Sequence, residues 1–362
     1  MIIYSWMTLV VNVRLSPRQA LRSRRFKKRS IRTFFLLIPP LLFACGGTRD
    51  EVVLEGSTMG TTYHVKYIPG DRGDRGDMAA QVDRLLQFLD AMLSTYQADS
   101  ELNRLNRAEV GRAFTVSPLL WQLLLIAQTV FENTGGAFDP TVGPLVDLWG
   151  FGPVDTNDRV PLATEIAALL PLVGYQHLEF LPSARAVRKQ VPIHIDLSAI
   201  AKGFAAEQVG ALLVEKGIED FMVEVGGEIQ AAGVNGKGQS WRIAIEAPVL
   251  ARGQVRKIIP LVNQGVATSG DYRNYFERDG IRYSHTIDPG SGYPISHKLA
   301  SVSVLNPSAT QADALATAYM VLGPDEALAM ANRDKVAAYF LVRSGADFVE
   351  HSSEAFARQM SD

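Results

Sequence analysis

The segment from Thr268 to Pro294 concentrates polar side chains where a purely structural segment would carry apolar ones. Its candidate chemical groups are Ser269, Asp271, Arg273, His285 and Asp288, which stand among glycines and prolines. The runs Asp288-Pro289-Gly290 and Gly292-Tyr293-Pro294 predict turns, so we expect His285 and Asp288 to be presented from a loop. A histidine with a pKa of ~6.5 is suited to take a proton near neutral pH. The alternative is a buried histidine that only makes hydrogen bonds.

A second candidate site begins at Asp196 and reads Asp-Leu-Ser-Ala-Ile-Ala-Lys-Gly. Ser198 is the expected N-cap of a helix from about Ala199 to Gly217, and Lys202 lies one turn into that helix. Backbone amides, the helix dipole and the ammonium group together favour a phosphate there. An ordinary capped helix with a surface lysine is the alternative. The spacing of a Walker loop is absent.

Asp313 and Thr317 form a third candidate site. They are four residues apart on a helix expected over Ala312–Leu322, so they share one face. A carboxylate and a hydroxyl on one face, with room for water and phosphate, suit Mg²⁺. Thr310 and Asp313 also fit a capping box, which would make the same residues purely structural.

Two further segments carry weaker signals. Glycines and aromatics from Gly135 to Thr141, continued by Trp149 to Gly152, allow close approach to a flat ligand and supply stacking surface. Small residues flank the soft side chain of Met59 between Ser57 and Thr61. Each segment taken alone would also fit an ordinary turn.

Hydrophobic patterning indicates the elements that position these groups. Alternation predicts strands around Val52 and Leu54 and from Thr62 to Tyr67. Helical spacing predicts core helices from Val82 to Leu93 and from Pro118 to Val130. Further strands are expected over Phe221–Val225, Trp241–Glu246, Lys257–Val262, Arg282–His285 and Ser301–Leu305. Because most strands follow the early helices without regular alternation, the class is α+β.

The N-terminus has the layout of an export signal. Nine Lys or Arg residues and no acid lie between Met1 and Arg32, and an apolar run then ends at Ala44. This run is too short to span a bilayer, so residues 1–44 are interpreted as a signal peptide. Leu42-Phe43-Ala44-Cys45 resembles the lipobox of bacterial lipoproteins, which makes Cys45 the lipidated residue of a tether over 45–55. An uncleaved anchor is the alternative.

Charge and length limit the functions of the remaining body. The whole chain carries −2 and the leader +9, so the 318 residues from Cys45 carry −11, which argues against a nucleic-acid partner. Cys45 is the only cysteine, so no internal disulfide forms. The body is expected as one functional domain over 56–345 followed by a C-terminal tail over 346–362.

Seven motifs in this order resemble the FAD:protein FMN transferases, also called the ApbE flavin transferases. The matching segments are STMGTTY at 57–63, STYQADSELNRLN at 94–106, GGAFDPTVGPLVDLWGFGP at 135–153, DLSAIAKGFAAE at 196–207, VEVGGEI at 223–229, ATSGDYRNYFERDGIRYSHTIDPGSGYP at 267–294 and ADALATAYMVLG at 312–323. The resemblance spans Gly56 to Gly323. It implies an α+β fold of two lobes with a FAD site between them.

The resemblance also implies a reaction, in which FMN passes from FAD to a Thr or Ser hydroxyl of a flavoprotein with Mg²⁺ present and AMP released. His285 would be the catalytic base, and the Ala199 carbonyl with Asp313 and Thr317 would hold the metal. The implied FAD-binding residues are Met59, Tyr96, Ala137, Phe138, Asp139, Asp196, Lys202 and Ile287.

The same phosphate-binding and metal-binding residues would also serve a FAD pyrophosphatase, in which water replaces the acceptor hydroxyl. A non-catalytic FAD-binding lipoprotein would need the pocket but neither His285 nor Asp313. The export signal predicts a protein that is lipid-anchored to a bacterial membrane, faces the periplasm and modifies a subunit of a membrane redox complex.

Overall fold

The computed structural model describes residues 48–70, 77–152, 158–248, 253–272 and 274–361. The leader, Cys45 and Arg273 therefore lie outside the described residues. The described residues belong to one compact unit within Gly46–Asp362. Among the described residues, no helix has the length and apolar character of a membrane span.

An eight-stranded antiparallel sheet forms the centre of this unit. Its order is β1-β2-β6-β7-β10-β13-β14-β15, so strands distant in sequence become neighbours. The bounds are β1 (Val52–Thr58), β2 (Thr61–Tyr67), β6 (Phe221–Val225), β7 (Glu228–Ala232), β10 (Gln264–Gly270), β13 (Leu299–Asn306), β14 (Ala337–Ser344) and β15 (Asp347–Ser352).

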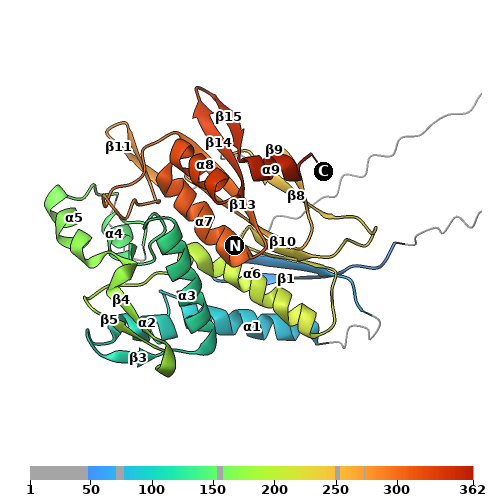
Figure 1. Ribbon diagram of the computed structural model, residues 1–362, viewed down its shortest axis with the longest axis horizontal. Coiled ribbons are helices and arrows are strands. Elements are labelled where there is room, and N and C mark those ends of the chain that lie inside the picture. The colour runs from blue at the N-terminus through green and yellow to red at the C-terminus, as the bar shows by residue number, and fades with distance from the viewer. Residues whose placement is uncertain (1–47, 71–76, 153–157, 249–252, 273, 362) are drawn as a thin grey trace, which may run out of the picture. The chain divides into compact units, whose positions relative to one another are not determined.

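Helices cover one face of the sheet, and Figure 1 shows α6 and α7 lying across it. The helices that contribute to two apolar clusters there include α1 (Met78–Leu93), α3 (Pro118–Asn133), α6 (Ser198–Glu215), α7 (Ala309–Leu322) and α8 (Pro324–Arg333). Successive residues of a strand point to opposite faces. Accordingly Ala267 packs under the helices, while Val266 joins a cluster on the other face.

That other face is covered by a hairpin and a short helix. The hairpin pairs β8 (Trp241–Glu246) with β9 (Val255–Leu261), and the helix is α9 (Glu354–Gln359). The segment expected as a C-terminal tail thus contains β15 and α9, and Phe356 is buried. Because layers cover both faces, nearly every residue of β13 is buried.

A smaller group of elements lies beside the sheet. It contains α2 (Glu101–Arg107), α4 (Gly143–Leu148), α5 (Ala163–Leu169) and the small sheet of β3 (Ala113–Thr115), β5 (Ala186–Lys189) and β4 (Leu178–Leu181). A hairpin of β11 (Tyr275–Arg278) and β12 (Ile281–Ser284) contributes Phe276 to an apolar cluster with Leu145, Trp149 and Ile287. This hairpin carries His285 directly after its second strand.

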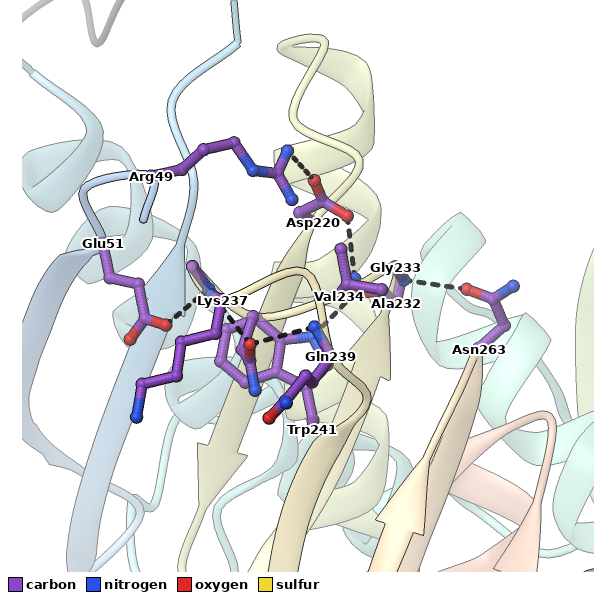
Figure 2. A network of polar contacts seen from close by, with 12 residues as sticks. Arg49, Glu51, Asp220, Ala232, Gly233, Val234, Lys237, Gln239, Trp241 and Asn263 are labelled. Carbon is purple, nitrogen blue, oxygen red and sulfur yellow. Dashed lines mark hydrogen bonds and ion pairs between the residues drawn. The ribbon is translucent and has the colours of Figure 1, made fainter. Parts of the chain in front are cut away.

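Polar contacts fix the chain where it enters the sheet (Figure 2). Arg49 pairs with Asp220 at 2.6 Å, and its backbone amide donates to the Gly236 carbonyl at 2.8 Å. The Gly236 amide donates in turn to Glu51 at 2.8 Å. These contacts join the segment before β1 to the loop between β7 and β8.

The predicted helices and strands are largely confirmed, with two corrections at helix starts. Ser198 is the first residue of α6 rather than its N-cap, because the Asp196 carboxylate accepts from both its amide and its hydroxyl. The capping box of Thr310 and Asp313 is wrong: Ser308 caps α7, while Thr310 donates to Glu207. Eight of the described strands were not predicted: β3, β4, β5, β7, β10, β11, β14 and β15.

Candidate functional site

A cavity of about 500 Å³ gathers residues from six of the seven motifs. Its lining includes Tyr96, Ala137, Phe138, Asp139, Asp196, Ala199, Lys202, His285, Ile287, Asp313 and Thr317. Met59 does not line this cavity. It lies in the turn between β1 and β2 and lines an adjoining hollow of about 570 Å³, which shares Tyr96, Ser198 and Lys202 with the first. Eleven of the twelve residues predicted for catalysis, FAD binding and metal binding thus line the cavity, brought together by the sheet and its helices, with Ala199 contributing from the start of α6.

A glycine allows α6 and α7 to meet at the metal-binding candidates. A Cβ at Gly203 would lie 2.3 Å from the Ala309 carbonyl oxygen and 2.8 Å from the Asp313 Cβ, so only glycine fits. The Gly203 amide donates to Asp313 Oδ2 at 2.9 Å. In a regular helix this amide points toward the carbonyl of residue 199, four positions earlier. The Asp313 carboxylate is therefore brought beside the first turn of α6, where the Ala199 carbonyl lies.

These groups fit a hard divalent cation. Asp313 is 3% exposed, and burial raises the pKa of its carboxyl, although Lys202 and the Gly203 amide oppose the rise. A buried carboxylate is stabilised by a cation beside it. Thr317 is on the same face of α7, and its hydroxyl lies 3.4 Å from that of Ser269. One carboxylate, one hydroxyl and one carbonyl are oxygen donors suited to Mg²⁺ with waters completing the shell.

The described residues contain no cluster of three or more His, Cys, Asp or Glu side chains placed to hold a metal. The candidate metal site therefore depends on mixed oxygen donors. Glu207 of α6 contacts the start of α7, the helix that carries Asp313. Its Oε2 accepts from the Ser308 hydroxyl at 2.5 Å and from the Thr310 hydroxyl at 2.7 Å. These contacts fix the start of α7, and with it the position of Asp313.

Lys202 projects from α6 toward two carboxylates. Its Nζ lies 3.0 Å from Glu228 and 3.9 Å from Asp313. Burial opposes the ammonium charge, but Asp313 and Glu228 outweigh it and raise the pKa of Lys202. The lysine therefore stays charged at neutral pH and can bind a phosphate. Asp196 orders the start of the same helix by accepting from the Ser198 amide at 2.8 Å, and the amides of Ile200 and Ala201 donate to the Leu197 carbonyl.

His285 is held by the backbone before its own hairpin. Its Nδ1 lies 3.0 Å from the Asn274 carbonyl oxygen, and the Phe151 ring meets the imidazole edge-on at 6.3 Å. Burial lowers the pKa of His285, although the Asn274 contact and Asp271 oppose this. A neutral imidazole with one nitrogen bound to a carbonyl has the other nitrogen free to accept a proton.

The turns after His285 take the predicted form. The Gly290 amide donates to the Asp288 side chain at 2.9 Å, and the Gly292 amide donates to the Asp288 carbonyl at 2.8 Å. Trp149 donates to the Gly292 carbonyl at 2.9 Å, and its ring stacks on Tyr283. Asp288 therefore shapes the turn, while Ile287 faces the cavity.

Asp139 is a buried acceptor that shapes the segment after Gly135. Its carboxylate accepts from the amide and hydroxyl of Thr141 at 2.8 and 2.7 Å, and from the Tyr175 amide at 3.3 Å. Burial raises the pKa of Asp139, although these hydrogen bonds oppose it. The arrangement places the neighbouring Ala137 and Phe138 in the cavity wall.

Tyr96 is 77% exposed at the rim that both hollows share. Its loop is fixed from behind by the buried Asn103 of α2, whose Nδ2 lies 3.3, 2.9 and 3.0 Å from the carbonyls of Ser94, Thr95 and Gln97. Arg104 and Arg107 donate to the carbonyls of residues 99 and 98. The exposed aromatic ring therefore stands on a constrained backbone.

Two acidic residues of the segment Thr268–Pro294, Asp271 and Asp288, have structural roles outside the cavity. Asp271 is buried away from the cavity and pairs with Arg343 of β14, with one contact at 2.9 Å. Asp288 accepts the hydrogen bonds that close the turn after Ile287.

The sequence interpretation missed Glu228, which lines the cavity and is 5% exposed. A glutamate directly after two glycines between apolar strands was the available signal.

Comparisons with known proteins agree with this geometry. A family model described as the ApbE family matches residues 59–340. The FAD:protein FMN transferase of Vibrio cholerae is 43% identical over 319 residues, covering 87% of this chain and 95% of that protein. The protein of the same name from Escherichia coli K12 is 38% identical over 311 residues, covering 85% and 88%.

Solved structures show the same fold. The apo form of the Pseudomonas stutzeri flavinyl transferase ApbE superposes with a TM-score of 0.80 at 42% identity, covering 86% of this chain and 98% of that one. The ApbE protein of Thermotoga maritima superposes with a TM-score of 0.77 at 29% identity, covering 85% and 99%.

Proposed function

The chain belongs to the ApbE family, and from this premise we propose that it transfers FMN from FAD to a Thr or Ser hydroxyl of an acceptor flavoprotein and releases AMP. The observation that carries the proposal is the cavity in which Lys202, His285, Asp313 and Thr317 come together. These residues combine a phosphate-binding cation, a free base and oxygen donors for Mg²⁺.

Binding of the FAD diphosphate is assigned to the start of α6. The positive end of the helix dipole and the ammonium group of Lys202 both attract negative charge. Mg²⁺, held by the Ala199 carbonyl, Asp313 and Thr317, would neutralise charge on the diphosphate. Tyr96 and Met59 border the adjoining hollow, and Ala137, Phe138 and Ile287 border the other end of the cavity.

His285 is assigned the role of general base. Its free Nε2 takes the proton of the acceptor hydroxyl while that oxygen forms a bond to the phosphorus of the FMN half. The bond from this phosphorus to the oxygen bridging toward AMP breaks, and AMP leaves with the electron pair. The acceptor then carries FMN through a phosphoester.

The direct test incubates the protein with FAD, Mg²⁺ and a flavoprotein that carries an acceptor hydroxyl. We expect a fluorescent band on the acceptor that survives denaturation, together with one AMP per flavin attached. Normal FAD binding without such a band would refute the transferase activity. AMP and free FMN without a band would identify a FAD pyrophosphatase instead.

We also propose that the protein is exported and lipid-anchored through Cys45, and that it modifies a subunit of a membrane redox complex from the periplasmic side. The apolar run that ends in Leu-Phe-Ala-Cys supports this proposal. Expression of the full chain and of Cys45→Ser tests it. The parent should fractionate with membranes and the variant should be released, whereas equal membrane retention of both would contradict lipidation at Cys45.

A further inference from the structure

The ammonium group of Lys202 lies between two carboxylates that have different tasks. In the part of the chain that the structure describes, the side chains of Glu228 and Asp313 lie within 4 Å of Nζ, at 3.0 and 3.9 Å. Only the shorter of these contacts is a hydrogen-bonded ion pair. Lys202 therefore donates a hydrogen bond to Glu228 and not to Asp313, the carboxylate assigned to the metal.

The turn between β6 and β7 is shaped to hold Lys202 in this position. Gly226 has φ of +62°, and a Cβ there would lie 2.9 Å from Lys202 Cδ, so the lysine stem packs directly on the turn backbone. Glu224 accepts from the Gly227 amide at 2.6 Å and closes the turn. Glu228 follows immediately and meets the ammonium group at the end of the stem.

Glu228 is a buried carboxylate and not an exposed surface charge. It is 5% exposed, and its Oε2 is buried with no hydrogen-bond partner among the described residues. A buried carboxylate without full pairing is costly to keep. Its position therefore calls for a role, and the contact that it does make is with Lys202.

We propose that Glu228 is a positioning residue that holds the Lys202 ammonium away from Asp313, so that Asp313 stays open to a divalent cation while Lys202 faces phosphate. The proposal rests on the proposed function, since it divides the tasks of the same diphosphate site. Without Glu228, the nearest described carboxylate for Lys202 is Asp313. A lysine that closed onto Asp313 would compete with the metal for the same oxygens.

The test measures cation binding to FAD-free protein, using Mn²⁺ counted by electron paramagnetic resonance because it prefers the same oxygen donors as Mg²⁺. The parent, Glu228→Gln, Lys202→Met and the double variant form a double-mutant cycle. Glu228→Gln should weaken Mn²⁺ binding about tenfold in the parent background. In the Lys202→Met background the same change should weaken it by less than about twofold.

The cycle separates positioning from simple loss of a negative charge. An equal loss of Mn²⁺ affinity in both backgrounds, or no loss in the parent background, would overturn the role of Glu228 and leave the transferase proposal standing. Failure of the parent protein to bind Mn²⁺ would refute the proposed metal site, and with it this role. Lys202→Met alone should tighten Mn²⁺ binding, because it removes a positive charge beside Asp313.

Glu224→Gln is the matched control. It removes one negative charge from the same pair of strands but keeps a side-chain oxygen to accept from the Gly227 amide, so the turn stays closed. Glu224 pairs with His64 at 2.6 Å rather than with Lys202. Its Mn²⁺ affinity should stay within about twofold of the parent. Thermal melting without ligand checks that each buried substitution leaves a folded protein. Glu228→Asp has a side chain too short to reach Lys202, so it should lose Mn²⁺ affinity as Glu228→Gln does.

Discussion

Nδ1 of His285 lies 3.0 Å from the carbonyl oxygen of Asn274, and this contact fixes which ring nitrogen is free. A carbonyl only accepts hydrogen bonds, so Nδ1 carries the proton and Nε2 keeps its lone pair. The backbone amide of His285 donates to the same oxygen at 3.2 Å. Both hydrogen bonds that orient the proposed base thus end on one backbone carbonyl.

His285→Ala should remove transfer and preserve FAD binding. General-base catalysis contributes roughly 10²- to 10⁴-fold, so we expect the flavinylation rate to fall within that range. The dissociation constant for FAD, measured by quenching of flavin fluorescence, should change little. A variant with full transfer activity would exclude His285 from the mechanism.

The value of kcat/KM for transfer should decline at a pH below 6.5. Burial lowers the pKa of His285, so the neutral base persists to a lower pH than in a free histidine. The value of kcat/KM should fall as pH drops through this lowered pKa and stay level up to neutral pH. Since the unfolded chain binds this proton first, the stability that neutral His285 contributes is likewise lost as pH falls below about 6.5. A limb centred above pH 7 would assign the base to another group.

Asp313→Asn should separate metal binding from folding. Asparagine keeps an oxygen for the Gly203 amide but loses the negative charge. Even outer-shell partners of a metal change affinity by about 10- to 100-fold, so we expect at least a tenfold rise in the Mg²⁺ concentration that gives half-maximal transfer. The melting temperature should not fall, because a buried charge is removed. Unchanged Mg²⁺ dependence would contradict the assignment.

Gly203→Ala should damage both the helix packing and the site. The added Cβ would be forced against the Ala309 carbonyl oxygen, a backbone atom that cannot swing aside. Overpacking of this kind costs about 1–3 kcal/mol, which urea unfolding measures. Gly210→Ala in the same helix is the comparison, since its Cβ meets the edge of the Phe221 ring at 2.9 Å, a side chain that can shift. Equal losses in the two variants would argue against a special contact at Gly203.

Asn103→Ala should release the loop that carries Tyr96. The change leaves three carbonyls without their shared donor, which costs about 1–3 kcal/mol in folding stability. We expect FAD affinity to weaken by about as much as in Tyr96→Ala. Calorimetry on both variants checks this, and normal FAD binding by a destabilised Asn103→Ala would show that the loop does not need to be rigid.

The sequence predicted the helices of the site better than its strands. α6 and α7 are each followed by a glycine that adopts positive φ, Gly217 and Gly323, and these glycines marked the helix ends in the sequence. β14 is covered on both faces and shows no alternation of polar and apolar residues. β10 escaped prediction because glycines and small polar residues dominate its sequence, which lacks the usual signal of a strand. Ser198 was misplaced by one position, since Asp196 supplies the capping oxygen.

Roles that depend on tertiary partners were beyond the sequence. Glu228 looks like any strand-initiating glutamate until Lys202 is placed beside it, and Asp271 looks like a site residue until Arg343 is found paired with it. The family resemblance placed the cavity residues, whereas burial and partner identity came only from the packing of α6, α7 and the central sheet.

The close contact of α6 with α7 joins residues 110 positions apart, Gly203 and Asp313. No fragment of the chain that stops before Thr317 contains the complete set of groups assigned to phosphate, metal and proton transfer. Long-range contacts of this kind form late in folding, because distant segments must first be brought together. A growing or partly folded chain would therefore lack the complete site until α7 packs against α6.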